Sequence, residues 1–124
     1  MSYSIEKSKD FIKVTYLGTL SNDDIQGVSR DAVHTDGDIL YFLDRIEDMR
    51  KLDSIKLGFK ELSSFTRNLQ NLQLPRIVKS AILTSGPLQY GIARMFQTIL
   101  DHPKMKIEIF SNEDEANKWL SSDQ

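Results

Sequence analysis

The sequence contains no cysteine and only two histidines, and these absences exclude several kinds of chemistry. Without cysteine the chain has no disulfide, no thiolate nucleophile and no cysteine-based zinc or iron–sulfur site. The two histidines, His34 and His102, are too few for a histidine-rich metal site. Each is predicted at the end of a helix, where a positive charge complements the helix dipole. We therefore expect no catalytic histidine, no bound metal and no cofactor.

Long hydrophobic runs are also missing. The longest, Ile39–Leu43, is far shorter than the roughly 20 residues that a membrane-spanning helix requires. The first ten residues carry four charged side chains and no apolar stretch, so they do not resemble a signal peptide. The sequence thus predicts a cytoplasmic protein with no integral membrane segment.

No large excess of positive charge is present either. The formal net charge is −2, which argues against nucleic acid as the main partner because phosphate binding needs a clustered basic face. The charges are uneven, however, with eight acidic residues against two basic ones between residues 19 and 48. Between residues 76 and 106 the balance is reversed, with five basic residues against one acidic. Such an asymmetric field is suited to orienting a protein partner.

What the chain does contain is enough material for one globular domain. It has 124 residues, of which 40% are hydrophobic and 27% charged, an ordinary composition for a folded domain with its own core. No linker, internal repeat or low-complexity tract divides it. We expect a single domain over residues 1–124.

The first part of the chain predicts a hairpin followed by a helix. Apolar residues at 3–5 and 11–17 indicate two antiparallel strands joined by a polar turn, the second ending at Gly18. Ser21 and Asp24 then form a capping-box pattern that opens a helix. Next, Ile39–Leu43 is an apolar run bounded by turn residues, which is typical of a strand buried on both faces.

The middle of the chain predicts a loop and then a helix. Residues 45–51 are mostly charged and indicate a loop after Asp44. A helix is predicted from Asp53 or Ser54 to the Leu74-Pro75 pair, because its apolar residues recur every three or four positions. These residues, expected to form one inner face, are Ile55, Phe59, Leu62, Phe65, Leu69 and Leu72.

The last part of the chain alternates strands and helices. Residues 77–83 predict a buried strand, and Pro87 suits the first turn of a helix that stops at His102-Pro103. Residues 107 and 109 mark a final strand, followed by a short helix capped by Asn112. The fold class is therefore α/β, with element order β-β-α-β-α-β-α-β-α and a mixed sheet of five strands with four helices.

Sequence motifs for known reaction types are absent. The chain has no Gly-x-Ser-x-Gly, no phosphate-binding Gly-x-x-x-x-Gly-Lys and no Gly-x-Gly-x-x-Gly. Asp44, expected at the carboxyl end of a central strand, is the best-placed acid, because ligands of open α/β sheets gather beyond those ends. It is a candidate ligand site together with Arg45, or alternatively a residue that caps a loop or pairs with Arg45.

Several segments resemble the SpoIIAA-like (STAS-like) family of small bacterial proteins. The similar segments are Phe42-Leu43-Asp44, Ser80-Ala81-Ile82-Leu83 and the helix sequence Tyr-Gly-Ile-Ala-Arg-Met-Phe at 90–96. Phe110 followed by Ala116, Trp119 and Leu120 completes the pattern, which covers about two-thirds of the chain. The resemblance implies a sheet backed by helices, in agreement with the order derived from periodicity.

The resemblance also implies a candidate regulatory residue. In the anti-sigma-factor antagonists of this superfamily, a serine at a helix start is phosphorylated by a partner kinase and partner binding is lost. Asp53-Ser54 lies at a similar distance after Asp44, which makes Ser54 a possible phosphorylation switch. Ile55 and Lys56 depart from the small residues of that motif, and a simple helix cap is the alternative for Asp53 or Ser54.

Three functions follow as hypotheses. The first is a non-enzymatic bacterial interaction or regulatory module that binds a protein partner or itself as a dimer, with Tyr90, Arg94 and Gln97 as the partner surface. The second is a carrier of a small hydrophobic ligand between sheet and helices, lined by residues such as Phe59, Leu62, Phe65 and Met95. The third is an enzyme that uses Asp44.

Overall fold

The computed structural model describes residues 3–8, 10–34 and 43–122 of the chain. Its centre is a five-stranded sheet in the order β1-β2-β3-β4-β5. β1 (Tyr3–Lys7) pairs antiparallel with β2 (Phe11–Ser21), and all other neighbouring strands are parallel. The predicted hairpin, element order and mixed five-stranded sheet are confirmed.

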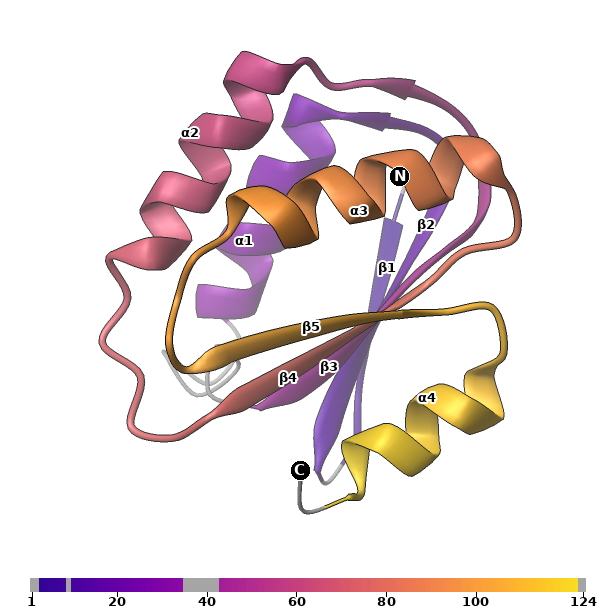
Figure 1. Ribbon diagram of the computed structural model, residues 1–124. Coiled ribbons are helices and arrows are strands. Elements are labelled where there is room, and N and C mark those ends of the chain that lie inside the picture. The colour runs from indigo at the N-terminus through magenta and orange to yellow at the C-terminus, as the bar shows by residue number, and fades with distance from the viewer. Residues whose placement is uncertain (1–2, 9, 35–42, 123–124) are drawn as a thin grey trace.

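Three helices cover one face of the sheet and one helix covers the other (Figure 1). α1 (Asn22–His34), α2 (Phe59–Gln70) and α3 (Pro87–Ile99) each connect two adjacent parallel strands. Because every crossover is right-handed and steps one strand in the same direction, all three helices lie on the same face. After β5 (Met105–Phe110), α4 (Glu113–Leu120) folds back onto the opposite face (Figure 1).

The helix starts follow the capping chemistry read from the sequence. Ser21 and Asp24 form the predicted capping box, with the Ser21 backbone N–H donating to the Asp24 carboxylate at 3.1 Å and the Asp24 N–H donating to Ser21 Oγ at 3.3 Å. The Asn112 side chain accepts from the backbone N–H of Glu115 at the start of α4. Pro87 occupies the first turn of α3, as predicted.

The largest departure from prediction is the third strand. Most of Ile39–Leu43, the predicted buried strand, lies outside the described residues, and the described strand β3 runs over Asp44–Lys56. The predicted charged loop at 45–51 is therefore wrong. So is the helix start at Asp53 or Ser54, since α2 begins at Phe59 and β4 (Val78–Leu83) follows it. β3 lies between β2 and β4, and its charged side chains form ion pairs with one another.

Smaller corrections concern where elements end. β2 passes through Gly18 to Ser21 rather than ending there, and Gly18 has a positive φ of 72° beside a shift in the β2–β3 register. α2 ends at Gln70, before the Leu74-Pro75 pair. Phe59 was expected on the inner face of that helix but is 65% exposed at its first position.

Apolar residues gather on both faces of the sheet. The larger cluster lies under α1, α2 and α3, and includes Val14, Met49, Ile82 and Ala93. The smaller lies under α4 and is formed by Ile46, Ala81, Leu83 and Ala116, all with 0% exposure. Consecutive residues of a strand point to opposite faces, so β4, buried at every position, supplies both clusters.

Candidate functional site

The larger cluster does not fill the space between the sheet and its three helices. A cavity of about 90 Å³ lies there, lined by residues of β2, β3, β4 and β5 and of all three helices. The helical part of its wall is apolar and comprises Ile25, Val28, Leu62, Phe65, Leu69, Ile92, Ala93 and Phe96. A concave apolar space with a few polar groups is the usual form of a small-molecule site.

Two aromatic rings form the part of the wall where α2 meets α3. Phe65 of α2 stacks against Phe96 of α3, with ring centroids 5.9 Å apart and planes inclined at 28°. Such a pair stabilises the helix contact beyond simple burial. Next to it, the small side chain of Ala93 faces the cavity, and its lack of bulk contributes to the open space.

The floor of the cavity carries a polar network on the sheet. Arg45 and Glu47 lie two positions apart on β3, so their side chains share the cavity face. Arg45 Nε lies 2.7 Å from Glu47 Oε1, and the Tyr16 hydroxyl on β2 donates to Glu47 Oε2 at 2.8 Å. Both charged side chains are largely buried, with 12% of Arg45 and 16% of Glu47 accessible.

Tyr16 contributes a proton to this network rather than a charge. Burial, and next the neighbouring Glu47 carboxylate, raises the pKa of the Tyr16 phenol well above its usual value. The phenol therefore stays protonated and acts as a donor at neutral pH. Since Glu47 neutralises Arg45, the ion pair on the floor carries no net charge.

Ser80 adds a hydroxyl whose hydrogen-bonding capacity is unused. It lies on β4 as the register partner of Arg45, lines the cavity and is 5% exposed. Within residues 3–8, 10–34 and 43–122, its Oγ has no hydrogen-bond partner. The oxygen is not one of the fully buried atoms that lack a partner, so it keeps accessible surface, and an unengaged hydroxyl beside a cavity marks a position where a ligand or a water can bind.

Asp44 and Arg45, which were predicted to form one site at the carboxyl end of a central strand, point to opposite faces of the sheet. Asp44 is the first residue of β3, at the amino end of the parallel strands, so the reason for expecting a ligand there does not hold. Its carboxylate accepts from the backbone N–H of Lys79 at 2.9 Å and from Arg76 Nη1 at 3.2 Å. Arg45 points to the other face, because neighbours on a strand alternate, and reaches the cavity instead.

Ser54 is a strand residue and not the start of a helix. It lies on β3 opposite Thr19 of β2, and the two side-chain hydroxyls are 2.7 Å apart. The dipole argument that supported a phosphorylation switch at Ser54 therefore does not apply at this position. A switch role for Ser54 stays a prediction that rests on the family resemblance alone.

The three residues of the predicted partner surface all lie on α3. Tyr90 is 51% exposed, and Arg94 donates to the Gln97 side chain at 2.6 Å. Gln97 in turn donates to the backbone oxygen of Ile107 in β5 at 2.6 Å. Gln97 is therefore held by the fold, whereas Tyr90 presents its ring to solvent.

Sequence reasoning missed Tyr16, Glu47 and Ser80 and expected Phe59 and Met95 in a ligand pocket. Leu62 and Phe65 do line the cavity, but Phe59 and Met95 are exposed. Alternation of apolar and polar residues would have identified a strand over residues 44–52. This alternation is hidden in the sequence because both faces of β3 carry charged residues.

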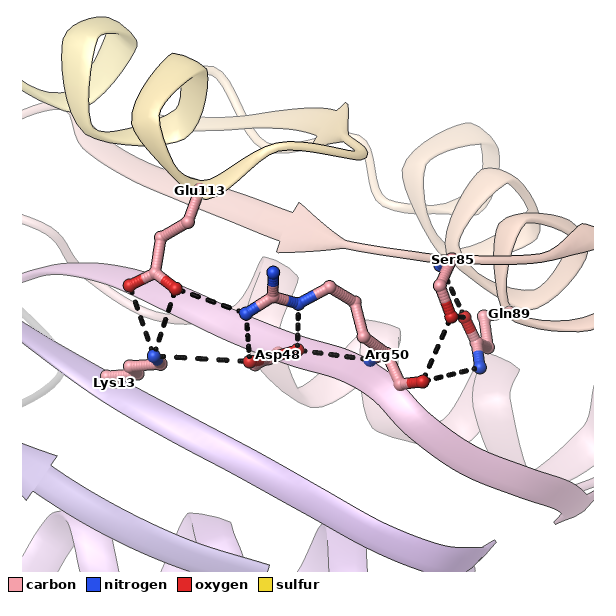
Figure 2. Close-up of polar contacts among 6 residues, drawn as sticks. All are labelled: Lys13, Asp48, Arg50, Ser85, Gln89 and Glu113. Carbon is pink, nitrogen blue, oxygen red and sulfur yellow. Dashed lines mark hydrogen bonds and ion pairs between the residues drawn. The ribbon is translucent and has the colours of Figure 1, made fainter.

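A second polar cluster lies on the α4 face and joins three elements (Figure 2). Lys13 of β2 and Arg50 of β3 both bind Glu113 at the start of α4, each at 3.1 Å. Arg50 also binds Asp48 at 2.9 Å, and Lys13 lies 4.0 Å from it. Burial acts to raise the pKa of Asp48, but hydrogen bonds from Arg50 outweigh it and hold that pKa below its usual value.

Arg50 links this cluster to the start of α3 through its backbone. Its carbonyl oxygen accepts from Ser85 Oγ at 3.0 Å and from Gln89 Nε2 at 3.3 Å, as Figure 2 shows. With every charge paired, the cluster fixes the relative positions of α4, β3 and α3. It is better suited to hold elements together than to bind a ligand.

Neither a metal site nor a membrane span is found in the part of the chain that the structure describes. No group of three or more histidine, aspartate or glutamate side chains is close enough there to hold a metal ion. No described helix is long and apolar enough to cross a membrane.

Comparison with known proteins identifies the fold. No protein-family model and no curated protein sequence matches the chain. Among solved structures, the chain is similar to the crystal structure of an uncharacterized protein from the DUF3478 family with a SpoIIAA-like fold from Shewanella loihica PV-4. The match has a TM-score of 0.60 and 16% sequence identity, and covers 95% of this chain and 91% of the other. This similarity confirms the predicted SpoIIAA-like fold.

Proposed function

We propose that this protein is a non-enzymatic binding module that holds a small, largely apolar molecule in the cavity under α1, α2 and α3. The observation that carries the proposal is the cavity itself, a space of about 90 Å³ in a core that is otherwise closely packed. Its wall is apolar and its few polar groups converge on one floor, which is how small-molecule sites achieve both affinity and orientation. This function corresponds to the second hypothesis from the sequence, a carrier of a small hydrophobic ligand between sheet and helices.

The volume limits the ligand. A dry engineered cavity of about 150 Å³ holds benzene, so a cavity of about 90 Å³ suits a compact molecule smaller than benzene, of about four non-hydrogen atoms. The apolar wall and the Phe65–Phe96 pair favour a hydrocarbon body, because transfer of apolar surface from water drives binding. Longer chains would require the helices to move apart.

The proposal is tested by titrating isobutane, which has four non-hydrogen atoms, into labelled protein and following the methyl resonances of cavity residues by NMR. We expect saturable shifts at Val28, Leu62 and Ile82, which line the cavity. Ala93→Val fills part of the space and should abolish these shifts, whereas Thr98→Val, on the exposed side of the same helix, should leave them unchanged. Absence of saturable shifts in the wild-type protein, or their persistence in Ala93→Val, would refute the proposal.

A second candidate is self-association through α3, which corresponds to the dimer form of the interaction hypothesis. It is favoured by Tyr90, which is 51% exposed and shares one side of the helix with Arg94 and Gln97, since aromatic and arginine side chains are enriched at protein contacts. Sedimentation equilibrium over a wide concentration range tests it. A dimer that Tyr90→Glu dissociates supports this candidate, and a wild-type monomer at the highest concentration rejects it.

The structure gives less support to an enzyme that uses Asp44. The Asp44 carboxylate is engaged by Arg76 and by the Lys79 backbone, and it lies on the opposite side of the sheet from Arg45 and the cavity.

A further inference from the structure

We propose that the cavity selects molecules that carry one uncharged hydrogen-bonding group, seated between the Ser80 hydroxyl and the Arg45–Glu47 pair. This inference rests on the proposed binding function and names the chemical class of its ligand. A short alcohol, ketone or amide belongs to that class, whereas an ionised acid or an amine does not.

The position of the polar group follows from Ser80. Its hydroxyl is nearly buried, lines the cavity and has no hydrogen-bond partner in the part of the chain that the structure describes. A hydroxyl can both donate and accept, so it can pair with a ligand oxygen or with a ligand O–H or N–H. The remaining wall is apolar, and a polar group placed against Phe65 or Phe96 would lose its hydrogen bonds to water without replacement.

Strand β3 supplies a second polar contact beside the Ser80 hydroxyl. Arg45 and Ser80 are register partners on β3 and β4, and both line the cavity. A ligand group bound to Ser80 Oγ therefore lies beside the Arg45–Glu47 pair. Tyr16 fixes the other carboxylate oxygen of Glu47 from β2, so the floor is held in place before a ligand arrives.

The charge balance of the floor selects against ions. Glu47 lies 2.7 Å from Arg45 and neutralises it, and the Tyr16 phenol is protonated, so among the described lining residues an entering ion meets no unpaired charge of opposite sign. The Asp24 carboxylate, which also acts on Tyr16, is not one of these lining residues. An ion buried in an apolar site without a counter-charge loses its hydration and is strongly disfavoured. A neutral group loses much less.

The experiment measures the binding of size-matched molecules to wild-type protein and to two Ser80 variants. The probes are isobutane, 2-propanol, isopropylammonium and acetate. In wild-type protein we expect binding of the first two and no saturable binding of the two ions at neutral pH. Ser80→Ala removes the hydroxyl with little change in shape and should raise the Kd of 2-propanol about tenfold, the usual effect of one lost hydrogen bond.

Isobutane is the internal control, since its Kd should change less than about twofold in Ser80→Ala. Ser80→Thr keeps the hydroxyl and should retain the wild-type ratio of the two Kd values, even though its extra methyl group narrows the cavity. An unchanged ratio in Ser80→Ala, or an ion that binds as tightly as 2-propanol, would overturn the inference while the cavity function stands. Failure of both isobutane and 2-propanol to bind wild-type protein would overturn the cavity function as well.

Discussion

The face of the sheet under α1, α2 and α3 borders an apolar cavity, whereas the apolar cluster under α4 is closely packed. Beside that cluster, the paired charges of Lys13 and Glu113 border a polar hollow of about 300 Å³. On the cavity face, the floor residues Arg45, Glu47 and Ser80 border open space. On the α4 face, Leu83 and Ala116 belong to one apolar cluster, and both are fully buried. Both sets of side chains come from the same strands, because alternate residues of one strand supply opposite faces.

The ionisable groups differ between the faces in the same way. Burial keeps the Tyr16 phenol neutral on the cavity face, by raising its pKa. On the α4 face, hydrogen bonds from Arg50 keep Asp48 charged, by lowering its pKa. The cavity face thus neutralises its charged groups in one ion pair, and the α4 face uses charge to hold a short helix. We interpret the first as the binding face and the second as the stabilising face.

Removing side-chain volume from the closely packed cluster under α4 should have the largest effect on stability. Leu83→Ala should lower the free energy of unfolding by about 2–5 kcal/mol, because the dense surroundings cannot collapse into the space left behind. Leu62→Ala on the cavity face should cost an amount at the low end of that range, since Leu62 already borders open space. Urea denaturation measures both, and an equal or larger loss in Leu62→Ala would contradict the difference in packing.

Adding side-chain volume should destabilise the closely packed cluster under α4 more than it destabilises the cavity face. Ala116→Val and Ala93→Val both insert two carbons at a buried helix position, so their helix-propensity costs are matched. The first has no room and should destabilise the protein by about 1–3 kcal/mol, whereas the second enters the cavity and should cost less than about 1 kcal/mol. Thermal denaturation compares the two. A larger loss in Ala93→Val would mean that the cavity has no space on the side of α3.

Strand β3 explains why the sequence revealed the fold but not the site. β4 was identified correctly, because most of its residues are apolar and every position is buried. In β3, Arg45 and Glu47 face the cavity while Asp48 and Arg50 face α4, so charged residues stand on both sides and the pattern looks like a loop. These charges pair within β3 itself, and Tyr16 and Glu113 add partners from other elements, so the charges are satisfied inside a sheet.

The site depends on contacts between strands that are distant in sequence. Tyr16 reaches Glu47 across 31 positions, and the Arg45–Ser80 pairing depends on the register of two parallel strands. Local periodicity carries no information about such registers. Capping residues are different, because Ser21–Asp24 and Asn112–Glu115 interact within one turn, and these were read correctly.

The Lys79 side chain contacts the C-terminal end of α4. Its ammonium group donates to the backbone oxygens of Trp119 and Ser122, at 2.9 Å and 2.6 Å, and lies 5.4 Å from the centre of the Trp119 ring. Lys79→Met keeps the apolar stem but leaves those oxygens without this donor, and should cost about 1.5 kcal/mol. The emission of Trp119, the one tryptophan of the chain, should shift to longer wavelength as the end of α4 loosens.

The control is Lys106→Met, which changes the exposed lysine paired with Lys79 on the neighbouring strand. We expect this variant to keep both the stability and the Trp119 emission of the wild-type protein. Equal effects of the two substitutions would show that α4 is not held by the Lys79 ammonium group.

The smallest expected effect concerns the pH dependence of the paired charges. The pKa of Asp48 is lower in the folded protein than its unfolded value of about 3.9, so its contribution is fully present at neutral pH. It is lost as the pH falls below about 5 and through the folded pKa. Asp48→Asn should therefore be about 1 kcal/mol less stable than wild type at pH 7, and this gap should close toward pH 3.

Asp53→Asn is the matched control, because Asp53 is an exposed acid on the same strand. Its free energy of unfolding should follow that of the wild-type protein at every pH. Urea denaturation at pH 7, 5, 4 and 3 gives the comparison. A stability gap between wild type and Asp48→Asn that stays constant with pH would mean that protonation of Asp48 does not weaken the charged cluster, and that α4 is held by its apolar contacts and Lys79 alone.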